Sequence, residues 1–500
     1  MMGLQLEELF GRVRELLIYD ASSPLIFNSG LFLFLFTGFL AGYVVLRHVT
    51  TLRILYVVAF SLYFYYKSSG IYFLLLIFVS ICDYIIAHAI ARSDDRRGRK
   101  QLVALSVAIN LGMLAYFKYT DFFIEMANGI VGGGFLEFQN IFLPVGISFF
   151  VFQSMSYTID IYRGQIRPLD RWIDYIFYLS FFPQLVAGPI VRARDFIPQI
   201  RRPLLVSREM YGRAIALIAV GLIKKAVISD YISLNFVDRI FDEPALYSGF
   251  ECLMGIYGYA LQIYCDFSGY SDMAIGIALL LGFRFPKNFD APYKSATITE
   301  FWHRWHISLS SWLRDYLYIS LGGNRKGKVR TYINLLITMV LGGLWHGAAV
   351  RFVLWGALHG VALALHKMWL AVVPWSKASG EQMNPLSRLL GIILTFHIVC
   401  LGWLLFRAED MQTVHLMLYQ IANNFNASII PQFVEGYKGV MALVVLGYGM
   451  HFMPSVICQD AERKVAGASF WWQVAVMVIV AWCVMQIKSS DIQPFIYFQF

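Results

Sequence analysis

The sequence predicts an all-α polytopic membrane protein with about eleven transmembrane helices, accompanied by re-entrant or interfacial helices. The 500 residues are 58% hydrophobic and only 15% charged, whereas soluble domains average roughly 45–50% apolar and about 25% charged residues. The hydrophobic residues gather in runs of roughly 20, the length that crosses the hydrocarbon core of a bilayer. Short loops rich in Lys and Arg separate many of these runs.

The first 24 residues predict an amphipathic helix that lies on the membrane surface. Hydrophobic residues recur at helical spacing between residues 4 and 18, and charged residues stand between them. Packing of this helix on the protein itself is the alternative. The first long hydrophobic run starts near Leu25 without a basic segment before it, so a cleavable signal peptide is not expected. Residues 25–500 are expected to form one transmembrane domain.

The first 140 residues alternate regularly between hydrophobic runs and loops. Spans are predicted at residues 25–46, 52–66, 71–91 and 102–118. The loop 92–101 is basic, whereas segment 119–140 is glycine-rich and acidic and contains no Lys or Arg. The positive-inside rule therefore places the N-terminus and segment 119–140 outside, and loop 92–101 inside.

This alternation is lost after residue 141. The run 173–191 contains two prolines and a glycine in its second half, which predicts a broken or re-entrant helix buried in protein or lining a cavity. The runs 249–268 and 270–283 are interrupted by a polar stretch with two carboxylates. Residues 284–300 are expected to be a polar loop. The later spans are predicted at residues 331–345, 350–373, 386–406, 437–454 and 469–487.

Two histidines stand at the ends of hydrophobic elements and are flanked by aromatic residues. His306 closes the stretch Phe301-Trp302-His303-Arg304-Trp305-His306, and His346 stands in Gly342-Gly343-Leu344-Trp345-His346-Gly347. An ionisable side chain near membrane depth is a functional candidate by default. A neutral imidazole in an apolar pocket is also a suitable general base. A structural histidine bonded to a carbonyl is the alternative.

Other polar and aromatic residues nearby allow two interpretations each. Trp302 and Trp305 fit an interfacial belt or the wall of a ligand tunnel. The basic turn Gly322–Lys328, which contains Asn324 and Arg325, fits a cytoplasmic loop or a site for the phosphates of a nucleotide-like donor. Asp266 fits a structural carboxylate or an acid–base partner.

Several classes of site are not expected. His303 and His306 share a helical face, but no tight cluster of His, Asp and Glu completes a ligand set, so no bound metal is expected. The six cysteines are scattered and form no CxxC pair, which fits small buried side chains. The net charge of +9 arises in loops between hydrophobic runs, so nucleic-acid binding is not expected.

Four stretches in this order and spacing resemble the membrane-bound O-acyltransferase family. They are Phe182–Ile190, Tyr264–Ala274, Phe301–Asn324 and Gly342–Gly347. Within the family they are most similar to the bacterial branch of alginate and peptidoglycan O-acetyltransferase membrane subunits. The resemblance implies helices around a central tunnel, His346 as the catalytic residue and His306 as the second important position. His303 occupies a variable position of the motif.

The resemblance also implies a reaction. Acetyl would pass from a cytoplasmic thioester, acetyl-CoA or a carrier-bound acyl group, to a hydroxyl of an extracytoplasmic polysaccharide such as alginate or peptidoglycan, directly or through a partner. His346 would act as general base, and His306 would polarise the carbonyl or orient His346. The candidates for the tunnel are Trp302, Trp305, Trp345, Asn324, Arg325 and Asp266. No bound cofactor is expected.

The same resemblance implies an SGNH-type acetyltransferase as an extracytoplasmic partner and a bacterial inner-membrane location. Teichoic-acid D-alanyl transfer within the same family is one alternative. A glycan transporter or flippase without chemistry is another, and a di-iron hydroxylase would need more clustered histidines than the chain offers. Only an acyltransferase should be intolerant of His346→Ala.

Overall fold

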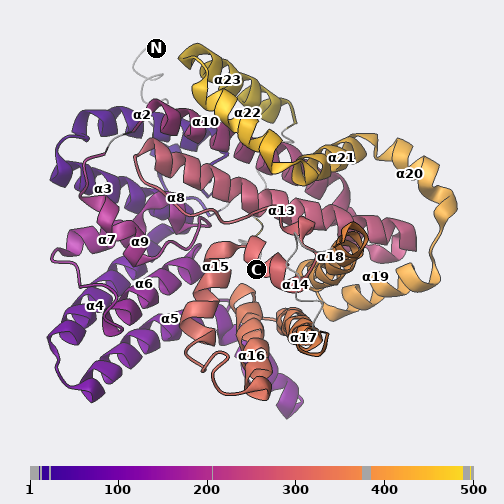
Figure 1. The fold of residues 1–500 in the computed structure, drawn as a ribbon, viewed down its shortest axis with the longest axis horizontal. Helices are drawn as coiled ribbons and strands as arrows, with labels where there is room; N and C mark the ends of the chain where they lie inside the picture. The colour runs from indigo at the N-terminus through magenta and orange to yellow at the C-terminus, as the bar shows by residue number, and fades with distance from the viewer. Residues whose placement is uncertain are drawn as a thin grey trace. The chain divides into compact units, whose positions relative to one another are not determined.

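The computed structural model describes residues 11, 14–21, 24–204, 206–373, 384–487 and 496. All regular structure in these ranges is helical (Figure 1). Most of the predicted N-terminal amphipathic helix lies outside the described residues; residues 14–17 within it are helical. The chain divides into two compact units. Among the described residues, the first unit takes those up to 204 and 281–285, and the second takes those of 206–280 and 286–496.

The first unit is built from helices near the start of the chain. They are α2 (Gly30–Leu46), α3 (Thr50–Ser69), the 3-10 turn η1 (Gly70–Tyr72), α4 (Phe73–Arg92), α5 (Arg96–Val131), α6 (Ile147–Tyr162), α7 (Trp172–Ser180), α8 (Phe182–Leu185) and α9 (Ala193–Ile200). The first three long helices match the predicted spans. Helix α5 continues through much of the predicted outer loop 119–140, so that loop prediction is wrong up to Val131. The helix ends only where Gly132 adopts the left-handed conformation with φ of 79°.

The predicted break in the run 173–191 is confirmed. Helix α7 ends at Ser180, Phe181 has φ of −52° and ψ of 108°, and only the short α8 follows. Residues 181–191 are buried throughout. The side chain of Gln184 donates a hydrogen bond to the Tyr178 carbonyl at 2.5 Å. Burial in protein is the condition under which irregular backbone is tolerated at membrane depth.

A buried carboxylate joins four helices of the first unit. Asp83 of α4 accepts hydrogen bonds from Ser106 at 2.6 Å and Asn110 at 2.7 Å, both on α5, and from Ser154 on α6 at 2.5 Å. The Ser154 hydroxyl also meets the Tyr175 hydroxyl of α7 at 2.7 Å. Three donors thus satisfy a carboxyl group that is fully buried.

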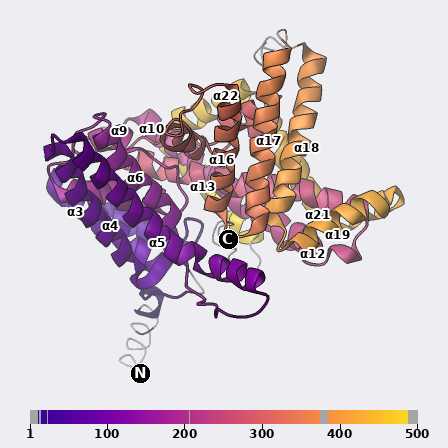
Figure 2. The ribbon, with the colours of Figure 1, turned by 90° about the horizontal axis from the view of Figure 1, so that it is seen from below.

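The second unit contains both predicted histidine stretches, Phe301–His306 and Gly342–Gly347. Its helices before residue 300 are α10 (Arg208–Leu222), the π-helix η2 (Ile223–Ser229), α11 (Asp230–Ile232), the π-helix η3 (Ser233–Val237), α12 (Asp238–Asp242), η4 (Pro244–Leu246), α13 (Gly249–Leu280), η5 (Pro292–Lys294) and α14 (Ile298–Arg304). Those after it are α15 (Ile307–Trp312), the π-helix η6 (Leu313–Tyr318), α16 (Lys328–His346), α17 (Val350–Val372), α18 (Pro385–Arg407), α19 (Met411–Asn423), η8 (Ala427–Ile429), α20 (Ile430–Gly436), α21 (Lys438–Phe452), α22 (Ser455–Gly467) and α23 (Phe470–Ile487). Helices α16, α17, α18, α21 and α23 match the five predicted later spans, and Figure 2 shows α17 beside α18.

The predicted interruption of the runs 249–268 and 270–283 by the polar stretch Tyr264–Asp272 is wrong, because α13 continues through that stretch as one helix. The carboxylates that suggested a break are paired with a neighbouring helix. Asp266 lies 2.5 Å from the ammonium of Lys225, and Asp272 lies 2.7 Å from that of Lys224. A paired carboxylate can remain in an apolar setting without help from broken backbone.

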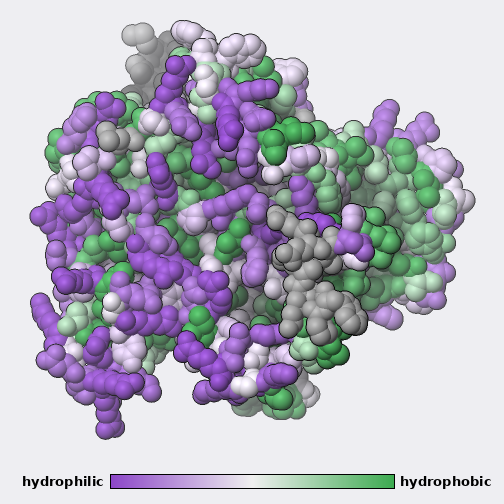
Figure 3. Space-filling model, in the orientation of Figure 1, coloured by the Kyte–Doolittle hydropathy of each residue, from purple (hydrophilic) through white to green (hydrophobic). Residues whose placement is uncertain are grey.

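The predicted count of about eleven spans is not confirmed. The described residues contain four helices long and apolar enough to cross a membrane, or up to six if each of two bent helix pairs is one span. Figure 3 shows hydrophobic side chains gathered over the region of α19 to α21, where Phe425, Val434 and Val445 are exposed. Exposed hydrophobic surface of this kind suits lipid contact. The helices therefore describe a multi-pass membrane protein.

Helices α16 and α17 approach each other closely at two glycines. A Cβ added to Gly343 would lie 2.1 Å from the Phe352 carbonyl oxygen, and one added to Gly356 would lie 2.3 Å from the Met339 carbonyl oxygen. Small residues permit this kind of helix contact in membranes. The pair fixes α17 against the end of α16 that carries His346.

We expect Gly343→Ala to lower the free energy of unfolding by about 1–3 kcal/mol, because the added methyl group must separate the two backbones. Thermal unfolding of the purified protein in detergent measures the change. Gly449→Ala is the matched control, since nothing lies within 4 Å of its added Cβ. Equal unfolding temperatures for the two variants would contradict the close contact.

Candidate functional site

His306 occupies a strained backbone position between two short helices. It precedes α15 with φ of 43° and ψ of 56°, in the left-handed region. A residue other than glycine reaches this region at an energetic cost, and such strain concentrates at functional sites. The backbone is held by pairing with an earlier loop. The amide of Ile307 donates to the Asn288 carbonyl at 2.8 Å, and the amide of Asp290 donates to the Arg304 carbonyl at 2.9 Å.

Hydrogen bonds to Asn288 define the tautomer of His306. Nδ1 of His306 lies 3.2 Å from Oδ1 of Asn288. The backbone amide of Ser308 donates to the same oxygen at 3.1 Å, which identifies that atom as an acceptor. The proton therefore belongs on Nδ1, and Nε2 carries a lone pair. Nε2 has no hydrogen-bond partner among the described residues, and the side chain is 1% exposed.

His346 ends α16 inside an aromatic enclosure. The ring centroids of Trp345, Trp355 and Phe406 lie 4.9, 5.0 and 5.2 Å from that of His346, which is buried. The Trp345 ring also lies 6.4 Å from His306. Both predicted histidines therefore lie next to the Trp345 indole. His346 follows Trp345 directly in the chain, whereas His306 lies 39 residues before it.

The predicted tryptophans are buried close to the histidines. Trp302 packs edge-on against Trp355 at 5.7 Å, and Trp305 packs against Trp403 at 4.7 Å. Phe289 links Trp305 to His306, with ring centroids 5.1 and 6.0 Å from them. Trp302 and Trp305 thus belong to the aromatic packing around the histidines. Their contact with a substrate stays a prediction.

The remaining predicted residues lie apart from this enclosure. Asp266 pairs with Lys225 and accepts a hydrogen bond from the Ile496 amide at 3.0 Å. Asn324 is exposed and bonds to Tyr318 and to Lys367. Arg325 is exposed in the same turn. Within the part of the chain that the structure describes, none of the three hydrogen-bonds to or packs on either histidine ring.

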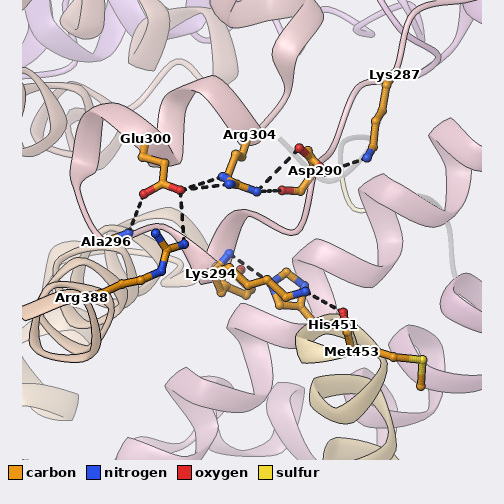
Figure 4. A network of polar contacts seen from close by, with 10 residues as sticks. Lys287, Asp290, Lys294, Ala296, Glu300, Arg304, Arg388, His451 and Met453 are labelled. Atoms are coloured by element: carbon orange, nitrogen blue, oxygen red, sulfur yellow. Dashed lines mark hydrogen bonds and ion pairs between the residues drawn. The ribbon is translucent and has the colours of Figure 1, made fainter. Parts of the chain in front are cut away.

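An ion network anchors α14, the helix that carries Trp302 and ends directly before Trp305 (Figure 4). Arg304 of α14 lies 3.0 Å from Glu300 on the same helix and donates to the Asp290 carbonyl at 3.1 Å. The Asp290 carboxylate also accepts from Lys287 at 2.6 Å. Glu300 accepts from the Ala296 amide at 2.9 Å and lies 3.9 Å from Arg388 of α18. The network fixes both ends of α14.

The same close-up contains a second anchor. Lys294 donates to the Met453 carbonyl at 2.6 Å, and His451 accepts from the Tyr293 amide at 3.1 Å. His303, by contrast, is exposed, and the described residues contain no group of three His, Cys, Asp or Glu side chains that would hold a metal ion.

Sequence reasoning missed two residues of the enclosure. Asn288 lies in the polar loop, 18 residues before the histidine it binds, and no spacing rule connects them. His359 lies in α17, and its ring is 4.8 Å from Trp355 and 5.2 Å from Trp302. A buried histidine on a predicted span is the one signal that was available.

The stability of the protein should depend on pH through His306, which lies outside the helices able to cross a membrane. Burial lowers the pKa of His306 well below its ordinary value, so the unfolded chain binds a proton that the folded protein excludes. The folded state should therefore lose stability as pH falls below about 6.5, by at most about 1.4 kcal/mol per pH unit from this group. Above that pH the group has no effect.

Thermal unfolding in detergent between pH 7 and pH 5 tests this expectation. His306→Asn should show a shallower dependence than the wild type. His303→Gln, which changes the exposed histidine of the same stretch, controls for the loss of a histidine as such. The same slope in His306→Asn and wild type would contradict the excluded proton.

Comparisons with known proteins agree on one family. The family model of the membrane-bound O-acyltransferases matches residues 171–406. A probable alginate O-acetylase of Pseudomonas aeruginosa is 41% identical over 79% of this chain and 74% of its own length. A peptidoglycan O-acetyltransferase of Helicobacter pylori is 34% identical over 78% of each chain. A teichoic acid D-alanyltransferase of Bacillus subtilis is 28% identical over 55% of this chain and 72% of its own length.

Proposed function

The chain belongs to the membrane-bound O-acyltransferase family and is a membrane O-acyltransferase, and on this premise we propose that it moves acetyl from a cytoplasmic thioester to a hydroxyl of an extracytoplasmic polysaccharide. The observation that carries the proposal is the enclosure around Trp345, where His346 and His306 both lie buried. The higher identity to O-acetylases than to the D-alanyltransferase favours acetyl.

His346 is the proposed general base. It takes the proton of the acceptor hydroxyl as the hydroxyl oxygen bonds to the thioester carbonyl carbon, and the carbonyl π electrons move to the carbonyl oxygen. The intermediate then reforms the carbonyl, breaks the carbon–sulfur bond and releases a thiolate, which takes the proton from His346. Positioned bases of this kind typically contribute about 10²–10⁴-fold in rate.

His306 has a different proposed role. Because Nδ1 donates to Asn288, the buried Nε2 carries a lone pair and cannot donate a hydrogen bond to a carbonyl. This favours binding of a hydroxyl, from the acceptor or a water molecule, over polarisation of the carbonyl. The two histidines then serve one reaction with separate tasks.

The donor is proposed to enter from the basic side of the second unit. The turn 322–328 carries Arg325, Lys326 and Lys328, and Lys367 of α17 joins it through Asn324. The positive-inside rule places such a face in the cytoplasm. Its cations suit the phosphates of acetyl-CoA or of a carrier-bound acyl thioester. We place the protein in a bacterial inner membrane, with an SGNH-type acetyltransferase as partner.

Transfer of labelled acetyl tests the function. Membranes containing the chain, and otherwise identical membranes without it, are supplied with labelled acetyl-CoA on the cytoplasmic side and with alginate or peptidoglycan on the other. Chain-dependent label in glycan ester supports the proposal. Label that appears only when an SGNH-type protein is added supports the relayed route. Chain-dependent transfer from a D-alanyl carrier, with none from acetyl donors, overturns the proposed acetyl specificity.

A further inference from the structure

A third histidine lies beside the enclosure without a hydrogen-bond partner. His359 of α17 is fully buried, and neither of its ring nitrogens has a partner among the described residues. The same holds, within those residues, for the indole nitrogens of Trp302 and Trp355. A buried donor left unpaired typically costs about 1–3 kcal/mol. Three such side chains together are uncommon in a folded protein and point to a bound group.

These three rings touch one another. The centroid of His359 lies 4.8 Å from that of Trp355 and 5.2 Å from that of Trp302, and the two indoles lie 5.7 Å apart. Phe301 stacks on His359 at 6.2 Å with an interplanar angle of 9°. Trp355 also contacts His346 at 5.0 Å. The cluster is therefore one ring away from the proposed base.

Two of the nitrogens face the same point of α18. A Cβ added to Gly402 would lie 2.8 Å from Nε2 of His359 and 3.4 Å from Nε1 of Trp355. An acceptor oxygen close to this point is within reach of both nitrogens. Glycine at position 402 is what keeps side-chain carbon away from them.

We propose that His359, Trp355 and Trp302 form the hydrogen-bonding site for the carbonyl oxygen of the acyl group. This inference rests on the proposed acyl transfer. When the hydroxyl oxygen bonds to the carbonyl carbon, the π electrons move to the carbonyl oxygen, and the N–H groups of the cluster stabilise the negative charge there. When the carbon–sulfur bond breaks, that charge returns to the carbonyl. Fixed donors in a buried, apolar enclosure are suited to this task.

Replacement of His359 by phenylalanine keeps the ring and removes its nitrogens. We expect kcat to fall by about 10–10³-fold, with KM for the acyl thioester changed less than about twofold. The N–H group of His359 is proposed to stabilise the transition state rather than to bind the thioester in its ground state. His359→Gln, which retains an N–H group, should recover part of the loss. His397→Phe is the control, since it makes the same change at a histidine of α18 bonded to Tyr257, outside the cluster.

A complementary variant removes no polar group. Gly402→Ala places a methyl group where Nε2 of His359 and Nε1 of Trp355 converge, and we expect it to lower kcat in the same direction as His359→Phe. Gly449→Ala should leave kcat unchanged, because its added Cβ meets nothing within 4 Å. The unfolding temperature of every variant is measured in parallel, so that rates are compared per folded molecule.

The outcomes separate this inference from the proposed function. Wild-type kcat in His359→Phe, with His346→Gln inactive, would overturn the carbonyl site and leave the acyl transfer intact. In another outcome, total activity falls equally in His359→Phe and His359→Gln while the rate per folded molecule stays at the wild-type value. That result would assign His359 a structural role and also overturn the site. Full activity in His346→Gln would overturn the proposed mechanism itself.

Discussion

Replacement of His346 by glutamine should lower kcat for acyl transfer by roughly 10²–10⁴-fold, while the protein remains folded and in the membrane. Glutamine approximates the size of the imidazole and can hydrogen-bond, but it cannot accept the hydroxyl proton at neutral pH. The buried ring lies among Trp345, Trp355 and Phe406.

Incorporation of labelled acetyl into glycan ester, normalised to folded protein, measures this effect. His366→Gln is a suitable control, because His366 lies on α17 and meets the Thr299 hydroxyl at 2.8 Å, away from Trp345. Undiminished incorporation by His346→Gln would remove His346 from the chemistry. It would also favour the alternative of a glycan transporter or flippase without catalytic activity.

Replacement of Lys225 by methionine should lower the free energy of unfolding by about 3–5 kcal/mol. The Lys225 side chain is 3% exposed, and its ammonium lies 2.5 Å from Asp266 and 2.8 Å from Asp230. Without it, the nearly inaccessible Asp266 carboxylate is left in an apolar setting with its charge uncompensated. The cost follows from the stranded carboxylate rather than from the lost attraction.

A second substitution separates these two explanations. Lys225→Met combined with Asp266→Asn should recover much of the loss, because it removes the stranded charge. Lys224→Met is the matched control: its partner Asp272 is 22% exposed, so water replaces part of the ion pair and the loss should be smaller. Thermal unfolding in detergent compares the four proteins. A double variant no more stable than Lys225→Met would contradict the stranded-charge explanation.

Hydrophobic runs predicted the membrane class and most of the later helices, because run length directly reflects the thickness of a bilayer. They failed where long-range pairing decides the structure. Asp266 and Asp272 suggested broken backbone in a single sequence, but Lys225 and Lys224 on another helix neutralise them. The glycine-rich, acidic composition of segment 119–140 predicts a loop. Residues 119–131 are nevertheless helical, because α5 ends only at Gly132, which adopts the left-handed conformation.

The candidate site shows the same division. His306 and His346 were predicted because an ionisable group beside indoles in an apolar run is rare enough to be noticed. Asn288 carries no such mark, and its importance arises from backbone pairing between the polar loop and residues after α14. His359 became significant only through the rings that surround it. Asn324 and Arg325, which a basic turn suggested, lie at a separate surface.

Helix α5 is longer than the bilayer is thick, so part of it projects beyond the lipid. Its 36 residues extend for about 54 Å at 1.5 Å per residue, whereas the hydrocarbon core is roughly 30 Å thick. The positive-inside rule places its basic N-terminus at the cytoplasmic surface. The final turns of α5 then project beyond the headgroups of the opposite leaflet. Segment 132–146 is then carried clear of the lipid, at the level where a water-soluble protein would meet it.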